Sequence, residues 1–241
     1  MLNKTTVRGV FVAAVVATML AGTARADTIY DLCADFSATA NPNGVWSYGV
    51  EEALGGPLVP FTTTYNPSGG LYAWFLSPEQ LQPPCVGFNS TAYPYSYTPE
   101  TGITNTIPPF TTDASPGGPS DPFTVIRFTA PTTSEYTLNA TFMGLSAFTQ
   151  SEVYVVDNGS TLFTNGIIGN ESNPTFLDPT LQLSAGDSVD FAVATGGGST
   201  DDTGITATLT AVPEPSTIVL LSIGAIGLFG WARRRRRAVK A

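Results

Sequence analysis

The 241-residue sequence contains no histidine, and this absence excludes several kinds of chemistry. Histidine is the commonest general base in enzymes and the commonest protein ligand of transition metals. Zinc sites of the usual kinds, Ser-His-Asp triads and Cys-His dyads are therefore excluded. Because 42% of the residues are apolar and only 12% are charged, the chain also lacks the composition of a disordered acidic tail. Its length suits one domain or two small ones.

Basic residues are nearly absent from the central part of the chain. Nine of the ten lysines and arginines lie near the two ends, which leaves Arg127 as the only base between residues 27 and 212. Eighteen of the nineteen acids lie in that segment, so its formal charge is −17. Such a field repels nucleic acids and anionic membrane surfaces, and both are excluded as partners. It favours solubility, and it favours divalent cations as counter-ions or ligands.

Residues 1–26 have the three parts of a secretory signal peptide. Lys4 and Arg8 provide a basic start, Val10–Leu20 is an apolar run, and Ala24-Arg25-Ala26 matches an A-x-A cleavage site. The apolar run is short for a transmembrane helix. We therefore expect export, with removal of this segment.

The C-terminal segment 213–241 also has three parts. A proline-rich motif comes first, and the apolar residues 217–232 that follow are just long enough for a transmembrane helix across a core of roughly 30 Å. A basic block then ends the segment and is expected to stay in the cytoplasm by the positive-inside rule. The motif and the block consist of Pro213, Glu214, Pro215, Arg233, Arg234, Arg235, Arg236 and Arg237.

These three parts, in this order, resemble the PEP-CTERM sorting signal of exported bacterial proteins. The resemblance implies an exosortase, a membrane enzyme that recognises the tail and processes it near the PEP motif. It implies brief anchoring in the inner membrane with the ectodomain in the periplasm. Release or attachment at the cell surface or in an extracellular polysaccharide matrix (biofilm) follows. No particular activity is implied, because very different ectodomains carry this tail.

Residues 27–212 have the sequence pattern of an all-β domain. Apolar residues alternate with polar ones over Ser134–Phe142, Asp187–Thr195 and Thr203–Val212, and Asp157-Asn158-Gly159 is a hairpin turn signal. These patterns predict an antiparallel β-sandwich or jelly roll that draws strands from both halves of the segment. Within it, Thr111–Pro122 is expected to be a loop or linker.

Cys33 and Cys85 are the only cysteines. Because the protein is expected to be exported into an oxidising space, the sequence predicts a single disulfide between them. A redox or catalytic pair is disfavoured, since the spacing is not C-x-x-C and no histidine or lysine is nearby.

Aromatic residues concentrate in the first half of the domain and suit the binding of sugars. Flat rings stack on the apolar faces of pyranoses, while amide and carboxylate groups bind the hydroxyls. The alternative for each ring is a place in the core or in a cross-strand ladder. The candidate binding residues are Trp46, Tyr48, Trp74, Tyr93 and Tyr95.

Three stretches also carry a likeness to an ectodomain type found beside PEP-CTERM tails. They are residues 41–49, 128–131 and 185–191. Those domains resemble jelly-roll carbohydrate-binding modules, so the likeness implies the same fold and a polysaccharide partner. With a single arginine in the domain, anionic polysaccharide would need a bridging cation.

Calcium is the natural bridging or structural cation, because it is bound by several oxygen ligands. Asp201, Asp202 and Asp157 lie in oxygen-rich loops and are the candidate ligands, although plain loops contain such residues as well. A glycan hydrolase that uses two carboxylates is the enzyme compatible with a lack of histidine. No stretch marks such a pair, and Glu51 and Glu52 are expected to be exposed.

Three functions therefore remain open for an exported surface or matrix protein. The favoured one is a non-enzymatic structural or adhesive component that binds polysaccharide weakly. The alternatives are a glycan-active hydrolase and a cation-binding acidic coat protein without affinity for sugar.

Overall fold

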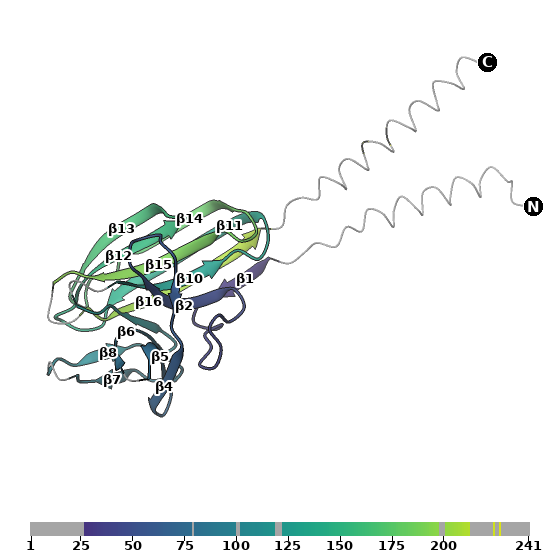
Figure 1. Ribbon diagram of the computed structural model, residues 1–241. Coiled ribbons are helices and arrows are strands. Elements are labelled where there is room, and N and C mark those ends of the chain that lie inside the picture. Colours follow the sequence, from purple (N-terminus) through teal and green to yellow (C-terminus); the bar gives the residue numbers. More distant parts are fainter. Residues whose placement is uncertain are drawn as a thin grey trace, which may run out of the picture. The chain divides into compact units, whose positions relative to one another are not determined.

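The alternation of apolar and polar residues produces two antiparallel sheets, and the predicted all-β antiparallel fold is confirmed (Figure 1). The computed structural model describes residues 27–78, 80–99, 102–118, 122–197 and 201–212, together with Gly224 and Gly227. Residues 28–212 form one compact unit. Within that unit none of the described residues is helical.

The first sheet has eight strands and includes both the first and the last strand of the unit. β1 (Thr28–Asp31) pairs with β16 beside the main path of the sheet. In spatial order that path is β14 (Thr175–Leu183), β11 (Ser134–Gly144), β16 (Thr203–Val212), β9 (Thr112–Ser115), β6 (Gln80–Asn89), β5 (Leu71–Ser77) and β4 (Thr63–Ser68).

The second sheet has six strands and faces the first. In spatial order they are β13 (Ser160–Ile168), β12 (Gln150–Asp157), β15 (Ser188–Thr195), β10 (Phe123–Thr129), β2 (Trp46–Glu51) and β3 (Val59–Pro60). A separate two-stranded hairpin consists of β7 (Tyr95–Tyr97) and β8 (Asn105–Ile107). As predicted, both large sheets draw strands from both halves of the segment.

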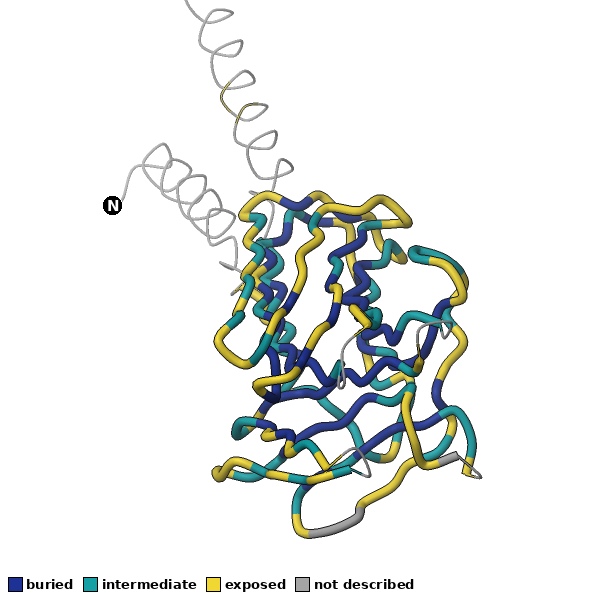
Figure 2. The backbone as a smooth tube through the Cα atoms, turned by 90° about the vertical axis from the view of Figure 1, so that its left-hand side faces the viewer, coloured by how far each residue is buried: buried dark blue, intermediate teal, exposed yellow. Residues whose placement is uncertain are grey.

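One hydrophobic core joins the inner faces of the two large sheets. Successive side chains of a strand point to opposite faces, so every second residue is buried. The predicted inner faces are confirmed on three strands. Figure 2 colours the buried residues of the chain dark blue. The buried residues are Tyr136, Leu138, Ala140 and Phe142 on β11, Val189, Phe191 and Val193 on β15, and Ile205, Ala207 and Leu209 on β16.

The predicted turn at Asp157-Asn158-Gly159 joins β12 to β13. Asn158 and Gly159 have φ angles of 46° and 81°, the left-handed values that a tight hairpin turn needs. Gly159 also permits a close approach by the loop that follows β2. A Cβ on Gly55 would lie 2.5 Å from the Cα of Gly159, so this loop is held against the turn.

The prediction of a loop over Thr111–Pro122 is wrong in its first part, because β9 occupies residues 112–115 in the interior of the first sheet. β9 pairs with β16 on one side and with β6 on the other. The sequence of β9, Thr-Asp-Ala-Ser, has no alternation of apolar and polar residues. Asp113 and Ser115 are buried all the same, since they belong to a polar cluster beneath the β7–β8 hairpin. A strand whose buried residues are polar cannot be recognised from hydrophobic alternation.

Two predictions concern residues outside the described ranges. The signal peptide at 1–26 lies wholly outside them, and only Gly224 and Gly227 of the expected membrane helix at 217–232 are described. Among the described residues, no helix is long and apolar enough to cross a membrane.

Candidate functional site

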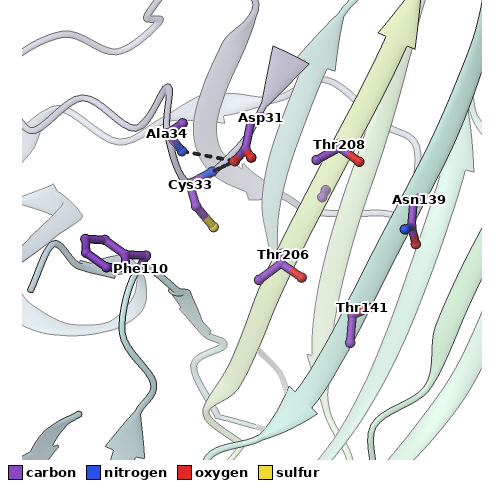
Figure 3. Close-up of a pocket in the computed structure, with 9 residues that line it drawn as sticks. Asp31, Cys33, Ala34, Phe110, Asn139, Thr141, Thr206 and Thr208 are labelled. Carbon is purple, nitrogen blue, oxygen red and sulfur yellow. Dashed lines mark hydrogen bonds between the residues drawn. The ribbon is translucent and has the colours of Figure 1, made fainter. Parts of the chain in front are cut away.

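A groove of about 350 Å³ lies on the outer face of the first sheet. Figure 3 shows its floor on β11 and β16 and its wall at the end of β1, with Phe110 at the edge, just before β9. The lining residues are Asp31, Cys33, Ala34, Phe110, Asn139, Thr141, Thr206, Ala207 and Thr208.

The floor is polar because β11 and β16 turn their polar residues outward when their apolar residues enter the core. In the strand register, Asn139 lies opposite Thr208, and Thr141 lies opposite Thr206. On the other side of β16, Asp31 of β1 lies opposite Thr208. Neighbouring strands are about 4.8 Å apart, so a carboxylate, a hydroxyl and an amide form one row across three strands.

The Asp31 carboxylate is held in place by its own loop. Its Oδ1 atom accepts hydrogen bonds from the backbone N–H groups of Cys33 (2.9 Å) and Ala34 (3.0 Å), as drawn in Figure 3. The N–H of Asp31 donates to Oδ2 of Asp35 (3.1 Å), which also accepts from the indole of the buried Trp46 (3.3 Å). The core tryptophan therefore fixes the loop that carries this carboxylate.

Phe110 has an unusual backbone conformation for an aromatic residue. Its φ is 52°, in the left-handed region, and its side chain is 55% exposed. For a bulky residue this conformation costs about 1–3 kcal/mol. The surrounding chain holds it, since the Thr111 hydroxyl donates to the carbonyl of Pro109 (3.1 Å) and Asn89 N–H donates to the carbonyl of Thr111 (3.0 Å). Burial of the ring does not explain the strain.

Asn89 connects the Phe110 loop to a second exposed ring. Its buried amide donates to the carbonyl of Tyr93 (2.8 Å) and to that of Pro108 (3.1 Å). The Tyr93 side chain is 77% exposed. One amide thus ties together the two loops that present exposed aromatic rings.

The structure places most of the sequence-predicted sugar-binding aromatics elsewhere. Trp46, Tyr48 and Trp74 are buried in the core, where they have no free face for a sugar, so their prediction as a binding surface is wrong. Tyr95 is half-buried against a smaller apolar cluster under the β7–β8 hairpin. Of the five candidates, Tyr93 is exposed.

The three buried rings point into the core. Trp46 and Tyr48 occupy inner positions of β2, and the Trp46 ring lies edge-on to Phe128 with centroids 5.4 Å apart. The Trp74 indole donates to the carbonyl of Ser37 (2.7 Å), which satisfies its one polar group. The second interpretation considered for the rings, a place in the core, therefore holds for these three.

A buried pair of carboxylates lies beneath the β7–β8 hairpin. Tyr97 donates its hydroxyl hydrogen bond to Asp113 (3.2 Å), while Asn105 donates to Asp202. The Ser115 hydroxyl hydrogen-bonds to Asp202 and lies 3.4 Å from Oδ1 of Asp113. Burial, and then the charge of Asp202, raise the pKa of Asp113 well above its ordinary value.

The three predicted calcium ligands do not come together. Asp202 is buried with Asn105 and Ser115, and it precedes Thr203, whose hydroxyl hydrogen-bonds to Ser151 at the start of β12 (2.7 Å). Asp157 lies at the other end of β12, six residues or about 20 Å along the strand. Within the described ranges, no group of three acidic or thiol side chains is arranged to hold a metal.

The predicted disulfide is absent, because Cys33 and Cys85 are both free thiols in the structure. Cys33 Sγ lies 3.8 Å from the carbonyl of Ile205, which is opposite Thr112 on β9. Cys85 is opposite Ser115, three residues or about 10 Å further along β9. Burial raises the pKa of Cys33 to about 12.

Glu51 was expected to be exposed, but it is buried and paired. Arg127 donates to Glu51 (2.5 Å) and to Asp190 (2.6 Å), which joins β10 to β2 and β15. Burial, and then Asp190, raise the pKa of Glu51 to about 7, although the Gly55 N–H and Arg127 oppose this shift. The only base of the domain therefore has a structural role.

Comparison with known proteins identifies the C-terminal segment. Residues 211–237 match the PEP-CTERM protein-sorting motif, so the predicted sorting signal is confirmed. The motif implies an exported protein that is sorted through the membrane and processed by an exosortase. No curated protein matches the chain.

Several solved structures resemble parts of the chain. A cyclase from Fischerella sp. TAU is 12% identical, with 73% of this chain and 88% of that one covered and a TM-score of 0.37. Carbohydrate-binding module CBM36, solved with calcium and xylotriose, is 13% identical, with coverage of 41% and 87% and a TM-score of 0.28.

A third structure is the GH26-CBM35 β-(1,4)-mannanase of Podospora anserina, which is 16% identical with a TM-score of 0.29. The match covers 52% of this chain but only 26% of the mannanase. All three TM-scores lie below 0.5, so neither the site nor the activity of this chain is inferred from them.

The residues of the groove were missed at the sequence level. The outward faces of β11 and β16 were visible as the polar positions of predicted strands. Their pairing with each other and with β1 was not visible, because the strands are far apart in sequence. Nothing in the sequence marks the left-handed conformation of Phe110.

Proposed function

We propose that the ectodomain is a non-enzymatic surface or matrix component that binds polysaccharide weakly in the groove of the first sheet. The observation that carries this proposal is Phe110, an exposed ring held in a strained conformation beside a row of hydroxyl, amide and carboxylate groups. Strain of this kind concentrates where a side chain has a binding role. A flat ring with adjacent polar groups is what a pyranose needs.

The carboxylates of the described chain support binding over hydrolysis. Glycosidases of the common type need two carboxyl groups on opposite sides of the scissile bond, roughly 5–10 Å apart. Asp31 is the one acid that lines the groove, and the nearby Asp35 uses its Oδ2 within the loop. The pairs elsewhere, Asp113 with Asp202 and Glu51 with Asp190, are buried.

The sorting signal supplies the setting for this function. After processing by exosortase, the domain would leave the inner membrane and periplasm and reach the cell surface or the extracellular matrix. There its acidic surface would keep it soluble, and weak binding to polysaccharide would retain it. Such a role is structural or adhesive.

Affinity electrophoresis of the full-length chain, in gels that contain individual polysaccharides, tests the proposal. We expect retardation by at least one polysaccharide, and we expect Phe110→Ala to abolish it. Phe148→Ala is the matched control, because Phe148 is also an exposed phenylalanine (61%) but does not line the groove. The gels are run with calcium and with a chelator.

Three outcomes would overturn the proposal. If no polysaccharide retards the chain in calcium or in chelator, the acidic coat protein without sugar affinity takes its place. If Phe110→Ala and Phe148→Ala have equal effects, the groove is not the binding site. Release of reducing sugar by the full-length chain would instead favour the hydrolase.

A further inference from the structure

The charges around the groove indicate which class of glycan it takes, an inference that rests on the proposed function. Asp31 is the only charged residue that lines the groove. Its Oδ1 atom accepts two backbone hydrogen bonds, which fix the plane of the carboxylate. Within the described ranges Oδ2 has no hydrogen-bond partner, so it remains able to accept one from a ligand.

Within residues 27–212, no cation is available to receive an anionic sugar. Arg127 is the only base between residues 27 and 212, and it lies in the second sheet, where Glu51 and Asp190 engage it. The formal charge of −17 over this segment adds a long-range repulsion against uronate or sulfate groups.

Phe110 adds a second attraction for positive charge. The face of an aromatic ring attracts a cation within about 6 Å of its centre. Phe110 and Asp31 line the same groove, from the loop before β9 and from the end of β1. An ammonium group at Asp31 would form an ion pair with the carboxylate, and the face of the Phe110 ring would add a weaker attraction. A neutral hydroxyl would form a hydrogen bond to the same carboxylate without the attraction between two opposite charges.

We infer that the groove selects polysaccharides that carry free amino groups, such as polymers of glucosamine, over neutral and anionic polysaccharides. Asp31 receives the ammonium group and Phe110 stacks on the sugar that carries it. The threonine and asparagine row, Thr206, Thr208, Thr141 and Asn139, binds the hydroxyls of adjacent sugars.

Isothermal titration of the full-length chain with oligosaccharides tests this inference. The ligands are glucosamine oligomers, their N-acetylated counterparts of equal length, and uronate oligomers, and the protein is kept in a detergent that contains no sugar. Because an ammonium group forms an ion pair with Asp31 and a neutral N-acetyl group does not, we expect glucosamine oligomers to bind about tenfold more tightly than the N-acetylated ones. Uronate oligomers should bind most weakly.

Asp31→Asn separates the local contact from the overall field. An asparagine oxygen can still accept from Cys33 and Ala34, so the loop should persist while the charge is lost. We expect the preference for amino sugars to disappear and the affinity for N-acetylated oligomers to remain. Glu52→Gln is the matched control, because it removes one exposed charge directly after β2 in the second sheet.

The outcomes distinguish this inference from the proposed function. Equal affinity for the glucosamine and N-acetylated oligomers would overturn the selectivity and leave the proposed function standing. Equal losses in Asp31→Asn and Glu52→Gln would assign the preference to net charge and overturn the role of Asp31. Absence of binding to all the oligomers and polysaccharides would overturn the proposed function itself.

Discussion

Asp113 and Asp202 are joined through the buried hydroxyl of Ser115, the last residue of β9. One hydroxyl has a single proton and cannot donate to both carboxylates at once. Two carboxylates held so close in a buried site do not both ionise readily. The raised pKa of Asp113 is the expected result.

This pair predicts that the domain loses stability as the pH rises. A carboxyl group with a raised pKa in the folded state contributes stability at low pH, which is lost as the pH climbs from the unfolded value through the folded one. While one such group titrates, the free energy of unfolding falls by up to about 1.4 kcal/mol per pH unit. Urea unfolding between pH 4.5 and pH 8.5 measures this slope. The Glu51 pKa of about 7 adds to it in the same direction.

Asp113→Asn separates the contribution of Asp113 to this pH dependence from that of Glu51, because an asparagine mimics the protonated acid. We expect the variant to match the original chain near pH 4.5 and to be more stable at pH 8.5. A variant that is equally destabilised at both values would show that Asp113 is not the group that titrates.

Replacement of the single central base should be costly. Arg127→Met leaves Glu51 and Asp190 buried without their cation, and removal of one partner from such a pair costs about 3 kcal/mol or more. The loss should be larger at pH 8 than at pH 5, because Glu51 becomes neutral below a pKa of about 7. Thermal unfolding at the two pH values measures the difference. A pH-independent loss would contradict this account.

Trp46→Ala should mainly lower the stability of the fold, whereas Phe110→Ala should mainly lower the affinity for glycan. Trp46 is fully buried and packs on Phe128, so its truncation should destabilise the fold by about 3–5 kcal/mol. The folded fraction should still bind glycan through Phe110, but more weakly, because the Trp46 indole no longer holds the Asp31 loop through Asp35. Phe110→Ala should lose binding with a small effect on stability. Parallel denaturation and binding curves check both, and a Trp46 variant that folds well but does not bind would restore the original prediction for this residue.

Phe110→Gly should abolish glycan binding and should stabilise the fold. Glycine adopts a φ of 52° without steric cost, so the substitution should relieve strain and stabilise the fold by about 1 kcal/mol. Phe110→Ala is the control, because alanine loses the ring but remains an L-residue in the left-handed region. Equal unfolding midpoints in urea for the two variants would show that the loop does not hold residue 110 under strain.

The contact between Gly55 and Gly159 predicts a position-specific effect of alanine. Gly55→Ala would place a methyl group 2.5 Å from the Cα of Gly159, and Gly186→Ala meets open space. Both glycines have positive φ angles, 74° and 94°, so the conformational cost is shared. We expect Gly55→Ala to be more destabilising by about 1–3 kcal/mol, the usual cost of overpacking. Equal unfolding free energies would argue against a tight contact.

The sequence predicted the fold where one face of each strand was apolar. The inner faces that contain Tyr136 and Phe191 were recognisable because hydrophobic burial repeats every second residue. The prediction of a binding surface failed for Trp46 because the chemistry of an aromatic ring suits a sugar site and a core equally well. The Phe110 groove depends on strand register and on a backbone angle, and neither is encoded in a local pattern.

The pairing of β1 and β11 with β16 has a mechanical consequence for any pull on the C-terminal end of the domain. β16 ends at Val212, one residue before the PEP motif, and it has a neighbouring strand on each side. The Ser134 hydroxyl also donates to the carbonyl of Val212 (2.7 Å). Tension along β16 loads the hydrogen bonds to both neighbours in parallel, so they share the force instead of opening one after another. The last strand is therefore suited to bear a load that is applied at the C-terminal end of the domain.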